Sequence, residues 1–274
     1  MISVIIPVYN ADRFLGKSIG SVTEQKEVSE ILLVNDGSTD DSLRIMKSKA
    51  VEDSRIQILE HKNGQNHGRS ATRNLGIQNA KNDIIAFLDA DDYYLPGRFK
   101  EHIEIVLEDG NIDGVYGHVG IQNFNKTQNF EEKDDICWNN DLTITPTNLF
   151  TSIAPIGDDF FIHANALTVR KDVFEKSGMF NENFEVAEDV EMWSRIALLN
   201  RLVAGDLSKP IAIRTIHDDN VFNQRVKYKG IKAKLLKSLL IFSITHHMLI
   251  RYRLKTWCGI ILALRFSFFR RFKK

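Results

Sequence analysis

Residues 3–10 read Ser3-Val4-Ile5-Ile6-Pro7-Val8-Tyr9-Asn10, and this stretch decides the fold. A short, β-branched apolar run that ends in polar residues is typical of a strand buried on both faces of a parallel sheet. Similar runs follow at Glu30–Val34, Ile56–Glu60 and Ile84–Leu88, separated by helical patterns at Asp12–Thr23, Asp41–Glu52 and Arg69–Ala80. This alternation predicts an α/β fold with a doubly wound, mostly parallel sheet.

Polar residues gather where these strands end. Tyr9-Asn10 follows the first strand, Asn35-Asp36-Gly37 the second, and Asp89-Ala90-Asp91-Asp92 the fourth. Sheets of this kind bind ligands beyond the carboxyl ends of their strands. We therefore expect the functional site at this edge of the sheet.

The second part of the chain is less regular, and Asn111–Ile162 shows no clear period. Beyond it we predict a strand–helix unit at Ala166–Ser177 and a helix at Ala187–Leu199, followed by strands at Leu202–Asp206 and Ile211–Ile216. These elements complete one domain that ends near residue 220.

The charge of the chain is divided along its length. All 36 acidic residues lie at or before Asp219 and 14 of the 36 Lys and Arg residues follow it, so residues 1–219 carry a net charge of −14 and the rest +14. The two cysteines, Cys137 and Cys258, form neither a disulfide framework nor a metal motif, and the N-terminal residues do not resemble a signal peptide. We expect a cytoplasmic protein.

The acidic run at residues 89–92 is the strongest functional signal. Carboxylates two residues apart at a strand end can face one cavity, and Mg²⁺ or Mn²⁺ binds one or two carboxylates together with substrate phosphates. The structural alternative is a solvated turn that caps a helix beginning at Pro96.

Two further motifs lie earlier in the chain. Asp36 ends the second strand before a sharp turn at Gly37, where it could accept from a base or ribose group, and Asp40 or Asp41 can cap the next helix. Arg73 lies in a helix whose glycine-bearing N-terminal loop favours phosphate, so it could reach a diphosphate. The alternative for Arg73 is an ordinary surface position.

Two motifs lie late in the chain. Glu188-Asp189 opens an amphipathic helix, and His217 follows the last strand. The helix dipole alone favours acids at a helix start, and a lone histidine is more often structural than a ligand. Whether either motif indicates a functional site therefore depends on the residues around it.

Taken in order, these motifs resemble family 2 glycosyltransferases over about residues 1–220. The resemblance implies a GT-A fold with a Rossmann-like nucleotide-sugar-binding half at 1–110 and an acceptor and catalytic half at 111–220. It also implies transfer of a sugar from a nucleotide sugar to an acceptor hydroxyl with inversion, and a bound Mn²⁺ or Mg²⁺. The segment from Phe160 to Asn165 lies where acceptor contacts are expected.

The resemblance also implies roles for individual residues. Tyr9 would pack against the nucleobase and Asp36 would bind it, usually as uracil. Asp189 would be the general base, while Asp91 and His217 would hold the metal. Arg73 would line the nucleotide pocket and Asp89 would contact the ribose. The implied nucleotide-sugar site comprises Pro7, Tyr9, Asn10, Asp36, Arg73, Asp89, Ala90 and Asp91.

By analogy, the donor would be a UDP-hexose or UDP-N-acetylhexosamine, and the acceptor a glycan or lipid-linked glycan of a bacterial surface polysaccharide. A nucleotidyltransferase is the enzymatic alternative. Such enzymes carry a Gly- and Arg-rich phosphate loop after their first strand, whereas this sequence has no glycine before Gly16. A non-catalytic binding module of the same fold is a second alternative, which the presence of Asp89, Asp91, Asp189 and His217 disfavours. No nucleic-acid-binding motif is present.

The last part of the chain, residues 221–274, combines apolar and basic residues in helical patterns. Its longest stretch without Lys, Arg, Asp or Glu is Ser238–Ile250, too short to span a membrane. We expect this tail to lie on the anionic inner face of the cell membrane as a helical appendage. The alternative is that it packs onto the acidic body or onto a second subunit, giving a homo-oligomer.

Overall fold

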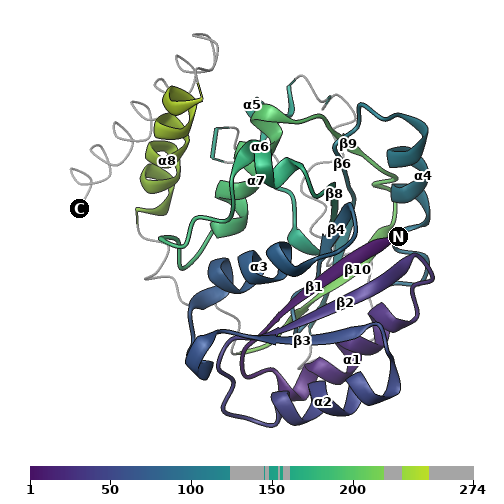
Figure 1. The fold of residues 1–274 in the computed structure, drawn as a ribbon. Helices are drawn as coiled ribbons and strands as arrows, with labels where there is room; N and C mark the ends of the chain where they lie inside the picture. Colours follow the sequence, from purple (N-terminus) through teal and green to yellow (C-terminus); the bar gives the residue numbers. More distant parts are fainter. Residues whose placement is uncertain (124–144, 146–147, 154, 157–160, 219–229, 247–274) are drawn as a thin grey trace.

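A computed structural model describes residues 1–123, 145, 148–153, 155–156, 161–218 and 230–246 of the chain (Figure 1). A seven-stranded sheet with the order β3-β2-β1-β4-β8-β6-β9 forms its centre. Parallel pairing joins the first four strands in that order and also joins β6 to β9, whereas β8 runs antiparallel to both β4 and β6. The sheet is therefore mostly parallel, as predicted.

Apart from β6, which lies in the segment without a clear period, the bounds of these strands agree closely with the runs read from the sequence. They are β1 (Ile2–Val8), β2 (Val28–Asn35), β3 (Ile56–Glu60), β4 (Ile84–Phe87), β6 (Gly114–Tyr116), β8 (Leu167–Arg170) and β9 (Leu202–Ala204). Successive residues of β1 enter opposite cores, which explains why this strand is apolar throughout. Val4 and Ile6 pack on one face and Ile5 on the other.

Helices cover both faces of the sheet (Figure 1). On one face lie α1 (Asp12–Thr23) and α2 (Ser42–Glu52), and α4 (Lys100–Glu108) packs on the same core. On the other lie α3 (Gly68–Asn79), α5 (Leu149–Ser152), α6 (Val173–Ser177) and α7 (Glu188–Leu199). Gly76 permits the close approach of α3 to β1, because a side chain there would collide with Ile5.

A second, three-stranded sheet with the order β5-β10-β7 flanks the first. Its strands are β5 (Tyr93–Tyr94), β7 (His118–Asn123) and β10 (Pro210–Ile216). The segment 111–162, irregular by sequence, thus supplies β6 and β7 to the two sheets. Their short lengths, three and six residues, explain why no period was visible.

The prediction of a helix beginning at Pro96 is wrong. Residues 93–94 pair with β10, and the amide of Leu95 donates to the carbonyl of Ile211. A turn that includes Gly97 at φ 74° follows, and the helix begins only at Lys100. Pairing with the second sheet thus keeps the chain extended beyond the acidic run.

The described part of the C-terminal tail is α8 (Ile231–Thr245), which packs on α7 through Leu235, Leu236 and Leu239. Ser238 adds a hydrogen bond of 2.8 Å to the buried carboxylate of Glu191. Over these residues the packing alternative is correct, while the rest of the tail lies outside the described residues. Among the described residues, no helix has the length and apolarity that a membrane crossing requires.

Candidate active site

The polar ends of three neighbouring strands meet at one edge of the sheet, as predicted. Tyr9 follows β1, Asp36 follows β2 and Asp89 lies two residues beyond β4, and these strands pair directly with one another. The Tyr9 side chain is half exposed at 52%, which leaves its ring available to a ligand, whereas Ala90 is buried. Pro7 is the last but one residue of β1.

Asp36 joins the ends of two loops. Its Oδ1 and Oδ2 accept from the amides of His67 and Gly68 at 2.7 and 3.0 Å, at the start of α3. Gly37 adopts φ 73°, and a side chain on it would strike the backbone of residues 64–66. The sharp turn expected at Gly37 is therefore confirmed, and a base bound by Asp36 would share its carboxylate with two backbone amides.

Asn10 and Asp40 join the loop after β2 to the end of β1. Asn10 has a left-handed backbone at φ 48°, and its side-chain oxygen accepts from the amide of Thr39 at 2.8 Å. Asp40 accepts from the amides of Asp12 and Ser42, the first residue of α2, whereas Asp41, the N-cap residue, makes no side-chain cap hydrogen bond. Asn10 is exposed, and its placement beside Tyr9 fits a lining role.

Arg73 is buried at 1% exposure, so its interpretation as a surface residue is wrong. Its guanidinium donates to Glu188 at 2.7 Å and to Asp89 at 2.8 Å and lies over the Phe180 ring. Burial alone would lower the pKa of Arg73, but these carboxylates outweigh it and raise that pKa. Arg73 is thus a fixed cation between the loop after β4 and the start of α7.

The Glu188-Asp189 pair begins α7 beside this cation. Ala187, just before it, is left-handed at φ 58° and caps the helix without a side-chain hydrogen bond, a strained geometry for a residue with a Cβ. Burial, and then the charge of Glu188, raise the pKa of Asp189 to about 7, although Arg73 opposes the shift. Asp189 is thus poised to take a proton near neutral pH.

Asp91 and His217 come together from distant parts of the sequence, as the resemblance implies. The Nε2 of His217 lies 3.1 Å from Oδ2 of Asp91, and the imidazole stacks on Phe14 of α1 with ring centroids 4.5 Å apart. His217 is nearly buried, whereas the Asp91 side chain is 31% exposed. This pair faces solvent through its carboxylate.

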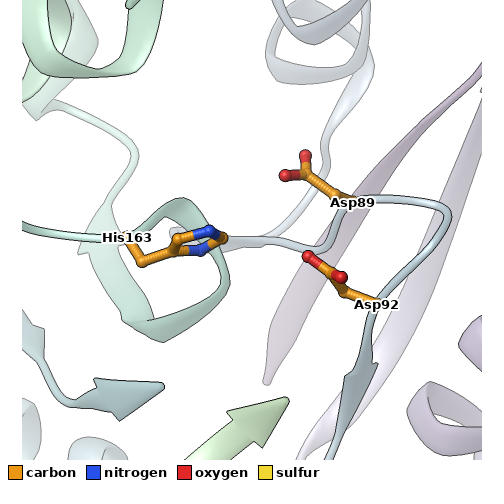
Figure 2. A group of neighbouring side chains, drawn as sticks. All are labelled: Asp89, Asp92 and His163. Carbon is orange, nitrogen blue, oxygen red and sulfur yellow. The ribbon is translucent and has the colours of Figure 1, made fainter. Parts of the chain in front are cut away.

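A second cluster of possible metal ligands lies next to the Asp91–His217 pair. Asp89, Asp92 and His163 each offer one potential ligand atom, and these atoms lie within 4.8 Å of one another (Figure 2). Burial lowers the pKa of His163 to about 4, so its imidazole is neutral at pH 7. However, Asp89 is held by Arg73, and both oxygens of Asp92 accept hydrogen bonds, from Thr215 and Asn165.

The model of glycosyl transferase family 2 matches residues 3–176. The chain belongs to this family. The match favours glycosyl transfer over the nucleotidyl-transfer alternative. It ends before the Glu188-Asp189 pair and His217, so the roles of these residues rest on their geometry and on the motif order.

Curated relatives agree with this assignment. An uncharacterized glycosyltransferase of Rickettsia felis is 33% identical over 254 residues, 92% of this chain and 40% of the relative. The glycosyltransferase GlyA of Streptococcus pneumoniae is 26% identical over 260 residues, 93% of this chain and 32% of GlyA. The chain therefore spans less than half the length of these two proteins.

Solved structures show the GT-A fold. S. aureus TarS in complex with UDP-GlcNAc superposes with a TM-score of 0.71 at 16% identity, covering 95% of this chain and 71% of that one. The mannosyltransferase PcManGT from Pyrobaculum calidifontis, in complex with GDP-Man and Mn²⁺, gives 0.61 at 13% identity over 96% and 75% of the two chains. The predicted fold class is thus confirmed.

Three residues of this site have no individual role predicted from the sequence, namely Asp92, His163 and Asn165. Asp92 lies in the acidic run itself, so its position gave a signal that went unused. The 160–165 segment was expected to contact the acceptor, whereas Asn165 is fully buried and binds the acidic loop. No sequence pattern distinguishes such an asparagine from one on the surface.

Proposed function

We propose that this chain transfers a hexose or N-acetylhexosamine, with inversion, from a nucleotide sugar to a hydroxyl of a glycan or lipid-linked glycan. The observation that carries the proposal is that two sets of side chains lie near the 89–92 loop, one that can accept a proton and one that can bind a cation. Asp189, with its raised pKa, interacts with the charges of Glu188, Arg73 and Asp89, and Asp91 of the same loop contacts His217. Transfer to a hydroxyl requires a base and a stabilised diphosphate, and these groups can supply both.

The Asp91–His217 pair is compatible with a divalent cation. Two neighbouring ligands of an octahedral Mg²⁺ at about 2.1 Å lie about 3 Å apart, and Nε2 of His217 and Oδ2 of Asp91, which are hydrogen-bonded to each other, lie 3.1 Å apart. Asp89 and Asp92 fit less well, because Arg73 and two N–H donors already occupy them. When bound there, Mn²⁺ or Mg²⁺ would neutralise the charge that develops on the leaving diphosphate.

The protein's own residues perform the remaining tasks. Tyr9 offers an exposed ring to the nucleobase, and Asp36, which is buried and accepts from two backbone amides, would bind the base through its remaining lone pairs. Arg73 holds Asp89 toward the ribose of the donor. It also holds Glu188 next to Asp189, the general base. Asp189 accepts the acceptor's proton as the new bond forms on the face opposite the leaving group, which inverts the anomeric centre.

The donor that we propose is UDP-linked. TarS, whose structure holds UDP-GlcNAc, has a higher TM-score than the GDP-Man-bound mannosyltransferase, and the family resemblance pairs the Asp36 position with uracil. Formation of a bacterial surface polysaccharide at the inner face of the membrane is the corresponding proposal for the acceptor. The basic tail is consistent with this location.

Slow hydrolysis of nucleotide sugars tests the proposal directly. The full chain is incubated with UDP-, GDP- and dTDP-linked sugars, with and without Mn²⁺, and release of the nucleoside diphosphate is measured. We expect a UDP-hexose or UDP-N-acetylhexosamine to be hydrolysed fastest, and only with metal. Equal rates for all bases, or rates indifferent to chelator, would contradict the donor or the metal respectively.

A further inference from the structure

Asp92 is a buried carboxylate whose two oxygens are both used inside the protein. Its side chain is 3% exposed, Oδ1 accepts from the amide of Thr215 at 2.7 Å, and Oδ2 accepts from Nδ2 of Asn165 at 2.6 Å. A buried carboxylate is costly unless it is hydrogen-bonded. Two N–H donors directed at one short side chain require two acceptors, which an aspartate provides and an asparagine does not.

Asn165 is the second member of this bridge. It is fully buried, and its side-chain oxygen accepts from the amide of Asp89 at 3.0 Å. Its carbonyl accepts from the Nε of Arg98 at 3.1 Å, and Arg98 is itself buried against the rings of Tyr94 and Phe99. Asn165 is therefore fixed on one side by Arg98 and holds the acidic loop on the other.

The bridge joins three segments that are distant in sequence. Asp92 belongs to the loop after β4, Asn165 to the short 3-10 turn Ala164–Ala166, and Thr215 to β10. Asp91 precedes Asp92 on the loop, and His217 follows Thr215 by two residues. The two hydrogen bonds of Asp92 thus set the place of the loop relative to the end of β10.

We propose that Asp92 is a positioning residue that holds Asp91 and His217 at the separation a divalent cation requires. The inference rests on the proposed cation site between those two residues. Neither Asp92 nor Asn165 needs to contact the cation or the donor for this role. Their substitution would act by changing the distance between Asp91 and His217.

An exchange of the two side chains tests the bridge. In Asp92→Asn, one N–H donor faces an amide NH₂ in place of an oxygen, and in Asn165→Asp two carboxylates face each other. The double variant Asp92→Asn/Asn165→Asp again offers acceptors to the amides of Thr215 and Asp89 and one donor–acceptor pair between the exchanged side chains. It restores every bond with one of them reversed. Asp172→Asn, at a half-exposed side chain on the α6 N-cap, is the matched control.

Two readouts are needed. Hydrogen exchange of the β10 peptide in metal-free protein reports the bridge itself, and calorimetric titration of UDP against Mn²⁺ concentration reports the spacing. We expect each single variant to exchange faster and to need about 10–100-fold more Mn²⁺. The double variant should return to within about threefold of the parent protein, with Asp172→Asn unchanged.

The outcomes separate this inference from the proposed function. A parent protein that binds UDP without regard to Mn²⁺ overturns the cation site, and with it this role for Asp92. Faster exchange with unchanged Mn²⁺ dependence overturns the positioning role alone, as does a double variant no better than the worse single one. If neither single variant folds, a folded double variant with the parent's Mn²⁺ dependence supports the proposal, and one that also fails to fold overturns it.

Discussion

The loop at residues 89–92 has two sides that are built differently. Toward α3 and α7, the buried Arg73 donates to both Asp89 and Glu188, so one cation holds two carboxylates. Toward β10, Asp91 meets His217 with its carboxylate partly exposed. Buried ion pairs therefore dominate the first side, whereas the second side has a histidine in contact with a partly exposed carboxylate.

This difference separates two ways of preparing a site. Buried ion pairs fix orientation and shift pKa values before any ligand arrives, and breaking one of them leaves an uncompensated charge. If Asp91 and His217 bind a cation as proposed, their contribution depends on the binding of the ion and the donor. Substitutions on the first side should therefore change chemistry and pH dependence, and those on the second should change metal dependence.

The largest effect is expected on the α7 side, at Asp189. Asp189→Asn keeps the shape but accepts no proton, so turnover should fall by about 10²-fold or more while UDP binding survives. Single-turnover kinetics and calorimetry measure the two quantities, and Glu185→Gln, at an exposed neighbour, serves as control. Turnover within a few-fold of the parent would transfer the role to another residue, with Glu188 the first to test.

The stability of the same variant checks that the fold is not at fault. The pKa of Asp189 is raised to about 7 in the folded protein, against about 3.9 in an unfolded chain. Its contribution to stability is thus fully present below pH 4 and lost as the pH rises through 7. Asp189→Asn lacks this loss, so its Tm at pH 8 should equal or exceed that of the parent.

The next effect is expected on the β10 side, at Asp91. Asp91→Ala should remove the gain in UDP affinity that Mn²⁺ gives, a loss of about tenfold or more, and leave metal-free binding as it is. Titration of UDP with and without Mn²⁺ measures both. Should the variant keep the full response to Mn²⁺, the cation would have to bind elsewhere, and the Asp89–Asp92–His163 group would be examined next.

A smaller effect is expected at Glu188, on the pH dependence of kcat. With Asp189 as base, kcat should rise about tenfold per pH unit below 7 and level off above it. Glu188→Gln removes a negative neighbour of Asp189 and frees Arg73 from one carboxylate, and both changes favour the charged form of Asp189. The midpoint should move to lower pH by about one unit. A midpoint that stays in place or moves to higher pH would show that Asp189 is not the group that titrates.

The smallest effect on turnover is expected from the tail. Residues 247–274 contain eight Lys and Arg and no acidic residue. Because α8 packs on α7, a chain ending at His246 should keep α8 and its UDP affinity. We expect the full chain, but not this shorter one, to sediment with vesicles containing anionic lipid, and salt should weaken the binding. A full chain that ignores such vesicles would favour a protein partner for the tail.

The first part of the chain, through β4, could be predicted from the sequence nearly element by element. Local periodicity determines β1 to β4 and α1 to α3, and a doubly wound sheet brings their ends together without further information. The order of the motifs then led to Asp91 and His217, 126 residues apart in the sequence and 3.1 Å apart in space.

The partners that fix these residues could not be predicted in the same way. Arg73 carries no local sign of burial, because its partners Asp89 and Glu188 lie 16 and 115 residues away. Pairing of β5 with β10 moved the start of α4 from Pro96 to Lys100, since a distant strand outweighed the local helix-start signal. Burial of Asn165 likewise depends on the packed fold and on no sequence period.

The turn at Gly37 limits how this chain can evolve toward other donors. Any side chain at Gly37 would meet the backbone of residues 64–66, so neither the turn nor the loop facing it can change alone. If Asp36 binds the nucleobase as proposed, selection for a different base has little freedom in the main chain around it. The side chains of Tyr9 and His67 are exposed, so changes there would leave this main chain as it is.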